Sequence, residues 1–189
     1  DYPGVKLSSI LEYLKGDRVQ EGEKGRFVRI RDLKDDKLDH LLDVKQIEVR
    51  ELPKVVRRIE ESSILLSMRW KTLKPTYFKY VNTPIYISND IIALTIDESK
   101  VNPFYLINEL HADNVVKQAE SYRAGATIPY LKREDLLSIK VVLPSIEEQK
   151  GKIKGLKELS IKIKLLEKER NSLVHGKSIA EFDEFASLK

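Results

Sequence analysis

The first hundred residues carry short apolar or alternating segments, a spacing typical of short strands rather than of long helices. Segment 63–68 is largely apolar, which predicts a buried strand. A strand at 5–7 and a helix at 8–14, capped by a serine and ended by Gly16, are expected near the start. The segments predicted as strands after that helix are 27–30, 47–50, 55–59, 63–68, 77–81, 85–87 and 91–96.

Helical spacing replaces this pattern after residue 101. Asn102 followed by Pro103 is typical of a helix start, because proline loses no hydrogen bond at the first helical position. A second helix is predicted at 113–122, and a strand at 139–143 that Pro144 ends. The chain up to Pro144 therefore combines strands and helices in one folding unit.

A different pattern begins at Ser145. Ser145 with Glu148 three residues later is typical of a capping box at a helix N-terminus. The helix is expected to run to about residue 174, roughly 45 Å at ~1.5 Å per residue. Its apolar side chains recur every three or four positions, and a seam of this kind requires a partner helix. The seam consists of Leu156, Leu159, Ile163, Leu166 and Leu173.

These patterns predict an α+β protein. Residues 1–143 are expected to form one globular domain with a curved mixed sheet and flanking helices. Residues 144–175 are expected to form a long projecting helix, a spacer or coiled-coil arm that mediates dimerisation. Residues 176–189 read as a polar tail.

Composition narrows the class of protein. With 41% hydrophobic and 34% charged residues, the chain can build a packed core. Cysteine is absent, which excludes disulfides and thiolate metal sites and fits a reducing, cytoplasmic location. The apolar runs are far shorter than the ~20 residues that span a bilayer, so no membrane association is expected. The chain begins at Asp1 without a signal-peptide pattern and stops abruptly at Lys189, and we expect it to be a piece of a longer protein.

Positive charge is concentrated in one part of the chain. The net charge is only +4, but residues 50–79 hold eight basic against three acidic residues. Within residues 67–80, four cations alternate with four aromatic residues and no acid. Cations can neutralise phosphates, arginine can read guanine edges, and aromatic rings can pack on sugars or bases. The predicted DNA-binding residues are Arg57, Arg58, Arg69, Lys71, Lys74 and Lys79, with Arg123 and Lys132 from a later loop.

The motifs that resemble catalytic ones have simpler structural interpretations. The segment from Asn102 to Tyr105 is similar to the Asn-Pro-Pro-Tyr motif of adenine methyltransferases, but it lacks the second proline and any glycine-rich loop for a methyl donor. The Glu148–Lys150 segment matches half of a nuclease motif without its Pro-Asp partner. The three histidines, His40, His111 and His175, lack the spacing of metal ligands. We therefore expect no enzyme activity, bound metal or cofactor in this chain.

Residues 122–149 carry a more specific signal. A glycine, Gly125, precedes a short isoleucine-containing turn, and a leucine-rich segment then leads into a strand. Pro144, a short gap, Glu148 and Gln149 open the long helix. In order and spacing this segment resembles the closing motif of specificity subunits of type I restriction–modification systems. The start at residues 5–10 and the strand at 64–67 also resemble that family, whereas Ser62, Ser63 and Trp70 depart from its usual glycines.

The resemblance implies different roles for the globular domain and the long helix. The globular domain would read double-stranded DNA in the major groove, while the helix would set the distance to a second recognition domain or a second copy and dock DNA methyltransferase subunits. Methyl donor, ATP and Mg²⁺ would belong to those partners. Three alternatives remain open at this point: a recognition fragment of a fused adenine methyltransferase or restriction enzyme, a coiled-coil adaptor between proteins, and a nuclease without a recognised motif.

Overall fold

The computed structural model describes residues 3–19, 22–36, 40–125 and 130–175. By their internal packing these residues belong to two units, one ending at Lys150 and the other beginning at Gly151. The predicted tail at 176–189 lies outside the described residues.

A four-stranded antiparallel sheet forms the middle of the first unit. Its strand order is β2 (Leu11–Tyr13), β10 (Ile91–Ile96), β7 (Ser63–Ser67) and β8 (Thr76–Phe78). The sequence of β7, Ser-Ile-Leu-Leu-Ser, is buried at every position, so both faces of this strand are covered. Its register against β10 pairs Ser67 with Ile91 and Ile64 with Leu94.

A second, five-stranded sheet is mixed. Its order is β3 (Asp17–Arg18), β6 (Arg57–Ile59), β9 (Ile85–Ile87), β4 (Lys24–Val28) and β5 (Val49–Glu51), and only the β4–β9 pair is parallel. The two sheets share one apolar cluster, to which each contributes buried side chains. The cluster includes Val28, Ile59 and Ile85 from the five-stranded sheet and Leu65, Phe78 and Ala93 from the four-stranded sheet.

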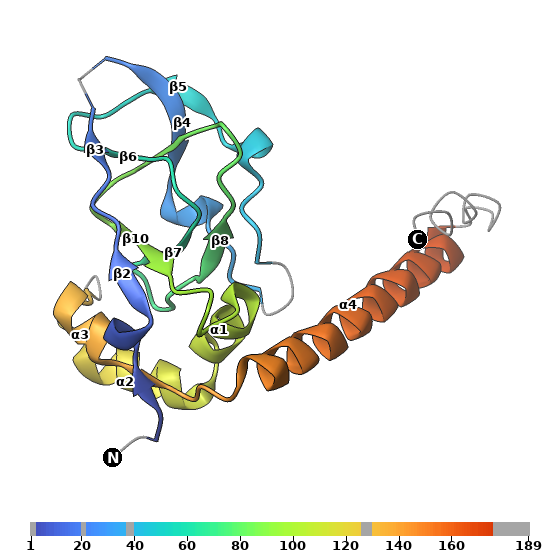
Figure 1. Ribbon diagram of the computed structural model, residues 1–189. Coiled ribbons are helices and arrows are strands. Elements are labelled where there is room, and N and C mark those ends of the chain that lie inside the picture. Colours follow the sequence, from blue (N-terminus) through green and yellow to red (C-terminus); the bar gives the residue numbers. More distant parts are fainter. Residues whose placement is uncertain (1–2, 20–21, 37–39, 126–129, 176–189) are drawn as a thin grey trace. The chain divides into compact units, whose positions relative to one another are not determined.

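The helices of the first unit gather at one of its ends. They are α1 (Pro103–Leu110), α2 (Asp113–Tyr122) and α3 (Arg133–Ser138). Figure 1 shows them at the end opposite β3–β6, with the four-stranded sheet between. Beside them β1 (Val5–Lys6) pairs with β11 (Lys140–Val141). Short 3₁₀ turns at Leu7–Ser9, Ile30–Asp32 and Val44–Gln46 complete the unit.

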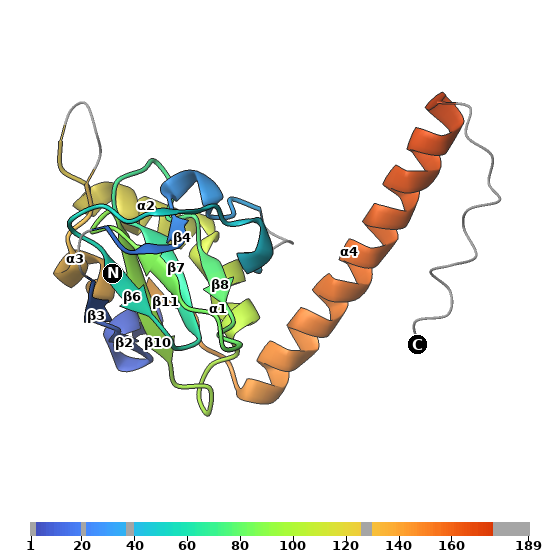
Figure 2. The ribbon, with the colours of Figure 1, turned by 90° about the horizontal axis from the view of Figure 1, so that it is seen from above.

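The long helix α4 (Ile146–His175) is continuous, as expected from its capping box (Figure 2). The backbone N–H of Ser145 donates to Glu148 Oε2 at 3.0 Å, and the Glu148 N–H donates back to Ser145 Oγ at 3.3 Å. The predicted start of α1 is also confirmed, because Asn102 Oδ1 accepts from the N–H groups of Phe104 and Tyr105. Local side-chain chemistry thus determines where both helices begin.

The α+β class is confirmed, but several elements differ from the sequence-based expectation. Residues 8–14 do not form a helix; Leu11–Tyr13 pairs with β10 instead, because an edge of β10 would otherwise lack backbone partners. Helix α3 was not predicted, and the strand expected at 139–143 is only Lys140–Val141. The strands also divide over two larger sheets rather than one, since β7 and β10 bury both faces and require apolar cover on each side.

Candidate nucleic-acid interface

Three distant segments meet at one end of the four-stranded sheet. The Leu131 N–H donates to the Met68 carbonyl at 3.0 Å, and the Met68 N–H donates to the Asp90 carbonyl at 2.8 Å. The Leu14 N–H donates to the Ala93 carbonyl at 3.0 Å, which fixes the end of β2 alongside. Backbone hydrogen bonds thus hold the end of β7, the β9–β10 turn and the segment before α3 together.

These segments, together with Arg57 of β6, border an open cleft of about 450 Å³, which we call the basic cleft. Apolar side chains such as Met68 and Ile91 contribute to its wall. Among the described residues, its polar lining holds four cations and one acid, Glu134. The charged and aromatic lining residues are Tyr13, Lys15, Arg57, Tyr130, Lys132, Arg133 and Glu134, with Ser88 and Asn89 from the β9–β10 turn.

Two arginines at the cleft lie over exposed tyrosine rings. The Arg133 guanidinium carbon lies 4.8 Å from the centre of the Tyr13 ring, and the Arg69 guanidinium carbon lies 5.3 Å from that of Tyr130. Tyr13 is 42% exposed and Tyr130 is 38% exposed. Arg69 Nε also pairs with Asp90 Oδ1 at 3.1 Å. Each guanidinium is therefore positioned before any ligand arrives, which lowers the entropy cost of binding an anion.

The structure separates the cations predicted for DNA binding. Arg57 and Lys132 line the basic cleft, and Arg69 borders it through Tyr130. Arg58 pairs with Glu60 at 2.7 Å, and it points away from Arg57 because neighbouring residues of a strand face opposite ways. Lys71 is exposed on the turn after β7. Cations that are close in the sequence therefore do not form one continuous surface in the structure.

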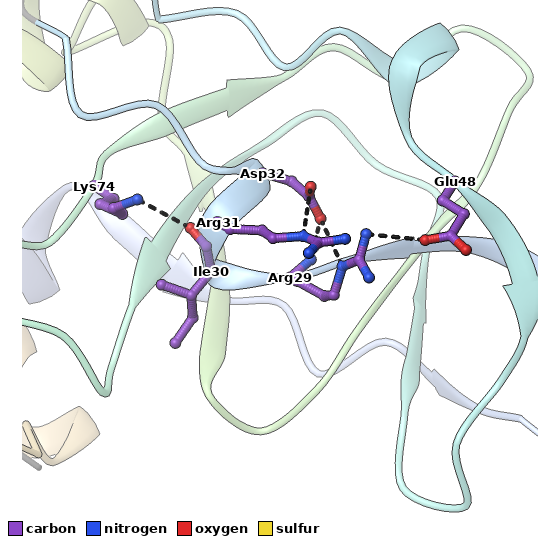
Figure 3. A network of polar contacts seen from close by, with 6 residues as sticks. All are labelled: Arg29, Ile30, Arg31, Asp32, Glu48 and Lys74. Atoms are coloured by element: carbon purple, nitrogen blue, oxygen red, sulfur yellow. Dashed lines mark hydrogen bonds and ion pairs between the residues drawn. The ribbon is translucent and has the colours of Figure 1, made fainter.

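Lys74 belongs to a separate polar network, shown in Figure 3. Its ammonium donates to the Ile30 carbonyl at 3.3 Å and lies 5.4 Å from the centre of the Trp70 ring. Next to Ile30, Arg29 donates to Asp32 and, at 3.0 Å, to Glu48. The acids in this network offset much of its positive charge.

Lys79 lines a second hollow, away from the cleft. This hollow has a volume of about 770 Å³ and also contains Arg26, Lys34 and Lys45. The Arg26 guanidinium is already engaged, since it donates to the Ile47 carbonyl at 2.8 Å. No aromatic ring lines this hollow among the described residues.

Arg123 is held differently from the other predicted cations. It caps the C-terminal end of α2, and its Nε and Nη1 atoms are buried without a hydrogen-bond partner among the described residues. Burial lowers the pKa of the Arg123 guanidinium, while the nearby Glu120 carboxylate acts in the opposite direction. Burying a donor without an acceptor is unfavourable, so the fold retains Arg123 at a cost.

Four cationic or aromatic residues that line the cleft were missing from the sequence-based set: Tyr13, Lys15, Tyr130 and Arg133. Tyr130 and Arg133 stand beside Lys132 in the segment 122–149, so proximity to a predicted cation could have suggested them. Tyr13 lies within the wrongly predicted helix at 8–14, and Lys15 follows it directly. Only the pairing of β2 with β10 brings them to the cleft.

The motifs that resembled catalytic ones have structural roles here. Asn102 caps α1, and its N–H donates to Gln149 Oε1 at 2.8 Å. The Gln149 amide also donates to the carbonyls of Lys100 and Pro144, while Glu148 caps α4. Within the described part of the chain, no group of three or more His, Cys, Asp or Glu side chains has the arrangement of a metal site. Helices in this same part are all too short or too polar to cross a membrane.

The chain is similar to a known protein family and to solved structures. Residues 43–175 match the sequence profile of the family described as "Type I restriction modification DNA specificity domain". No curated protein sequence matches the chain.

Two solved structures are similar in fold. One is the HsdS subunit from Thermoanaerobacter tengcongensis, with a TM-score of 0.58 and 18% identity over 87% of this chain and 39% of that chain. The other comes from a study of complex assembly and conformational transition of the type I R-M system, with a TM-score of 0.63 and 18% identity over 92% of this chain and 43% of that chain. The chain therefore spans about two fifths of the length of these relatives.

Proposed function

Because the chain belongs to the family of type I restriction modification DNA specificity domains, we propose that it recognises a sequence in double-stranded DNA and directs partner enzymes to it. The chain itself would catalyse nothing, and it would work in the cytoplasm. Residues 1–143 would form the recognition domain and residues 144–175 the spacer helix. DNA methyltransferase subunits would supply the chemistry, together with their methyl donor and metal ions.

The observation that supports DNA binding most directly is the basic cleft. Its four cations against one acid would attract a phosphate backbone. Lys15 and Lys132 are flexible point charges suited to phosphates, whereas the planar guanidinium of Arg57 can form paired hydrogen bonds. The exposed rings of Tyr13 and Tyr130 offer flat apolar surfaces for sugars or thymine methyl groups.

Arg69 is the proposed reader of a base. Its ion pair with Asp90 uses Nε, so the two Nη groups can form a bidentate contact with O6 and N7 of guanine. Its side chain is 53% exposed, which leaves the guanidinium accessible. The stack on Tyr130 limits its rotation, and a fixed fork discriminates between bases better than a mobile one.

The seam of α4 is the proposed site for a second helix, from another copy or from a second recognition domain. Leu159, Leu166 and Leu173 are each more than half exposed. Covering such a side chain is worth roughly 1.5–3 kcal/mol, so this surface favours association. Replacing Leu159 and Leu166 with serine should reduce self-association in sedimentation equilibrium, whereas Ile161→Ser, outside the seam, should not. Equal behaviour of the two variants would contradict this part of the proposal.

Fluorescence anisotropy with a labelled duplex of about 30 mixed base pairs tests DNA binding directly. The double variant R57A/K132A should weaken binding and reduce the salt slope by up to about two units, one for each lost phosphate contact. The matched control K24A/K54A removes two exposed lysines that do not line the cleft.

Selection from a random duplex library would then test sequence preference. Absence of duplex binding by the unaltered chain, with its helix still able to pair, would support a protein–protein adaptor instead. Equal effects of the cleft variant and its control would exclude the cleft as the DNA surface.

A further inference from the structure

The turn between β7 and β8 carries an exposed aromatic side chain. Trp70 is the single tryptophan of the chain, and it is 48% exposed. It follows Arg69, the proposed reader of a base, and precedes Lys71. The ring of Trp70 does not line the basic cleft, so the cleft does not account for its exposure.

Polar contacts on both sides hold this turn in place. The Ser67 N–H donates to the Leu73 carbonyl at 2.7 Å and closes the turn. The ion pair of Arg69 ties the turn to the start of β10. On the side of β8, the Thr72 hydroxyl donates to Asp35 Oδ2 at 2.8 Å. A side chain on such a turn is positioned before a ligand arrives, which lowers the entropy cost of binding.

The ring of Trp70 is itself held by Lys74. The Lys74 ammonium lies over the ring, 5.4 Å from its centre, and donates to the Ile30 carbonyl at 3.3 Å (Figure 3). Lys74 has φ +47, a left-handed backbone conformation that is uncommon for a residue other than glycine. Because one face of the ring lies against a cation, the ring cannot insert between two base pairs without losing this contact. The exposed part of the ring remains accessible to a ligand.

Trp70 and Arg69 lie at the same end of β7 but on different sides of it. Arg69 pairs with Asp90, which precedes β10, and Trp70 contacts Lys74, which precedes β8. Strand β7 lies between β10 and β8. Two strand spacings amount to roughly 10 Å, which is about three base pairs along DNA. One duplex docked at this end of the sheet can therefore meet both side chains in the same groove.

The major groove offers one group that suits the face of an indole ring. Base edges there present hydrogen-bond donors and acceptors, and the 5-methyl group of thymine is their one apolar group. The face of an indole has no hydrogen-bonding group, since its only donor is the ring N–H at the edge. Contact between the ring and the methyl group removes apolar surface of both from water, which is favourable.

We propose that Trp70 is a specificity-determining residue that packs against the 5-methyl group of a thymine; this inference rests on the proposed function. The thymine would lie within about three base pairs of the guanine that Arg69 reads. The contact favours thymine over cytosine at its position, because cytosine lacks the methyl group. Arg69 and Trp70 thus read two positions of one short sequence.

Replacing thymine with deoxyuridine removes the methyl group and keeps the base pair. Each thymine of a site selected from a random duplex library would be replaced in turn, and the affinity measured by anisotropy. At one position the unaltered chain should bind the deoxyuridine duplex about fourfold more weakly, the value for one buried methylene group. Trp70→Ala should bind the two duplexes equally, and Trp70→Phe should retain part of the difference.

Tyr122→Ala is the matched control. It removes another exposed aromatic ring, 41% exposed, that neither belongs to the turn nor lines the basic cleft. This variant should keep the full difference between the thymine and deoxyuridine duplexes. Circular dichroism and urea titration would verify that all three variants are folded.

Fluorescence of the unaltered chain gives a second readout, because Trp70 is its only tryptophan. Saturation with the selected duplex should shift the emission to shorter wavelength and reduce quenching by acrylamide, since the ring is removed from water. Deoxyuridine at the identified position should diminish both changes. Unchanged emission and quenching at saturation would contradict the contact.

Equal affinities of the unaltered chain for thymine and deoxyuridine at every position would overturn the inference. A loss in Trp70→Ala that leaves the fourfold difference intact would overturn it too. If R57A/K132A still weakened binding in either case, the proposed function would stand without Trp70. If the unaltered chain bound no duplex, the proposed function and the inference would both fail. If Trp70→Ala did not fold, the deoxyuridine series and Trp70→Phe would decide.

Discussion

Replacing Arg69 with alanine separates a recognition role from a structural one. The Arg69–Asp90 ion pair is about half exposed on both sides, at 53% and 47%, and pairs of this kind contribute roughly 0–1 kcal/mol to stability. The contact with the Tyr130 ring adds about 0.5–1 kcal/mol at an exposed site. Arg69→Ala should therefore lower the free energy of unfolding by no more than about 2 kcal/mol, and the domain should remain folded.

Binding should respond differently from stability. If Arg69 reads a guanine, its loss should cost on the order of 1–3 kcal/mol for the selected site and relax the preference at one position. Asp90→Asn is the matched control, because it removes the ion pair and keeps the guanidinium. That variant should lose only the contribution of the ion pair, roughly 0–1 kcal/mol in urea titration, and should bind DNA at least as well, since a negative charge is gone.

Selection from a random duplex library followed by anisotropy on the selected site measures both quantities. A recognition role for Arg69 is refuted if Arg69→Ala leaves affinity and preference unchanged. It is equally refuted if Asp90→Asn reproduces the full loss of preference, because the ion pair would then matter rather than the arginine fork.

Three further predictions concern the fold. Gly4 has φ +120, and a Cβ there would overlap the Val141 carbonyl oxygen, so Gly4→Ala should break the β1–β11 pairing and cost about 1–3 kcal/mol in urea titration. Asn102→Ala removes the cap of α1 and should cost about 1 kcal/mol, measured the same way. The Lys100 ammonium, at 2.8 Å, holds the pKa of Asp97 below its usual value together with Ser99. Because the pKa of Asp97 is lower in the folded than in the unfolded protein, the ionised carboxylate stabilises the fold at pH values above the unfolded pKa of about 3.9. Asp97→Asn should therefore destabilise the protein at neutral pH, and this destabilisation should disappear as the pH falls through the folded pKa of Asp97. A pH series of thermal melts in which the two proteins differ by the same amount at every pH would contradict the prediction.

Elements set by local chemistry were predictable from the sequence. Strands β9 and β10 and helix α2 have the predicted limits, because short apolar runs and turn residues mark their ends. Strand β2 was not predictable in this way. Its pairing of Leu11 with Ile96 joins segments far apart in the chain, and the local pattern of residues 8–14 contains no trace of that partner.

The same limit applies to the candidate site. Charge density pointed to Arg57 and Lys132, which the fold does bring to one cleft. It also pointed to Arg58, which the alternation of β6 turns to the other face. Tyr13 could not be recognised, since its place beside Arg133 depends on two long-range contacts, β2 with β10 and Leu131 with Met68.

The location of the cleft follows from how the sheets are buried. Strands β7 and β9 are buried at every position, and β10 is buried along its first four residues, so their faces have no room for polar ligands. The residues that contact a ligand must therefore lie at strand ends and in turns, and Lys15, Asn89 and Arg69 all occupy such positions. Exposed turns on a rigid core tolerate substitution, because few core contacts depend on them. If the cleft reads DNA, changes confined to these turns would alter the sequence preferred without lowering the stability of the core, and this separation would let one fold serve many recognition sequences.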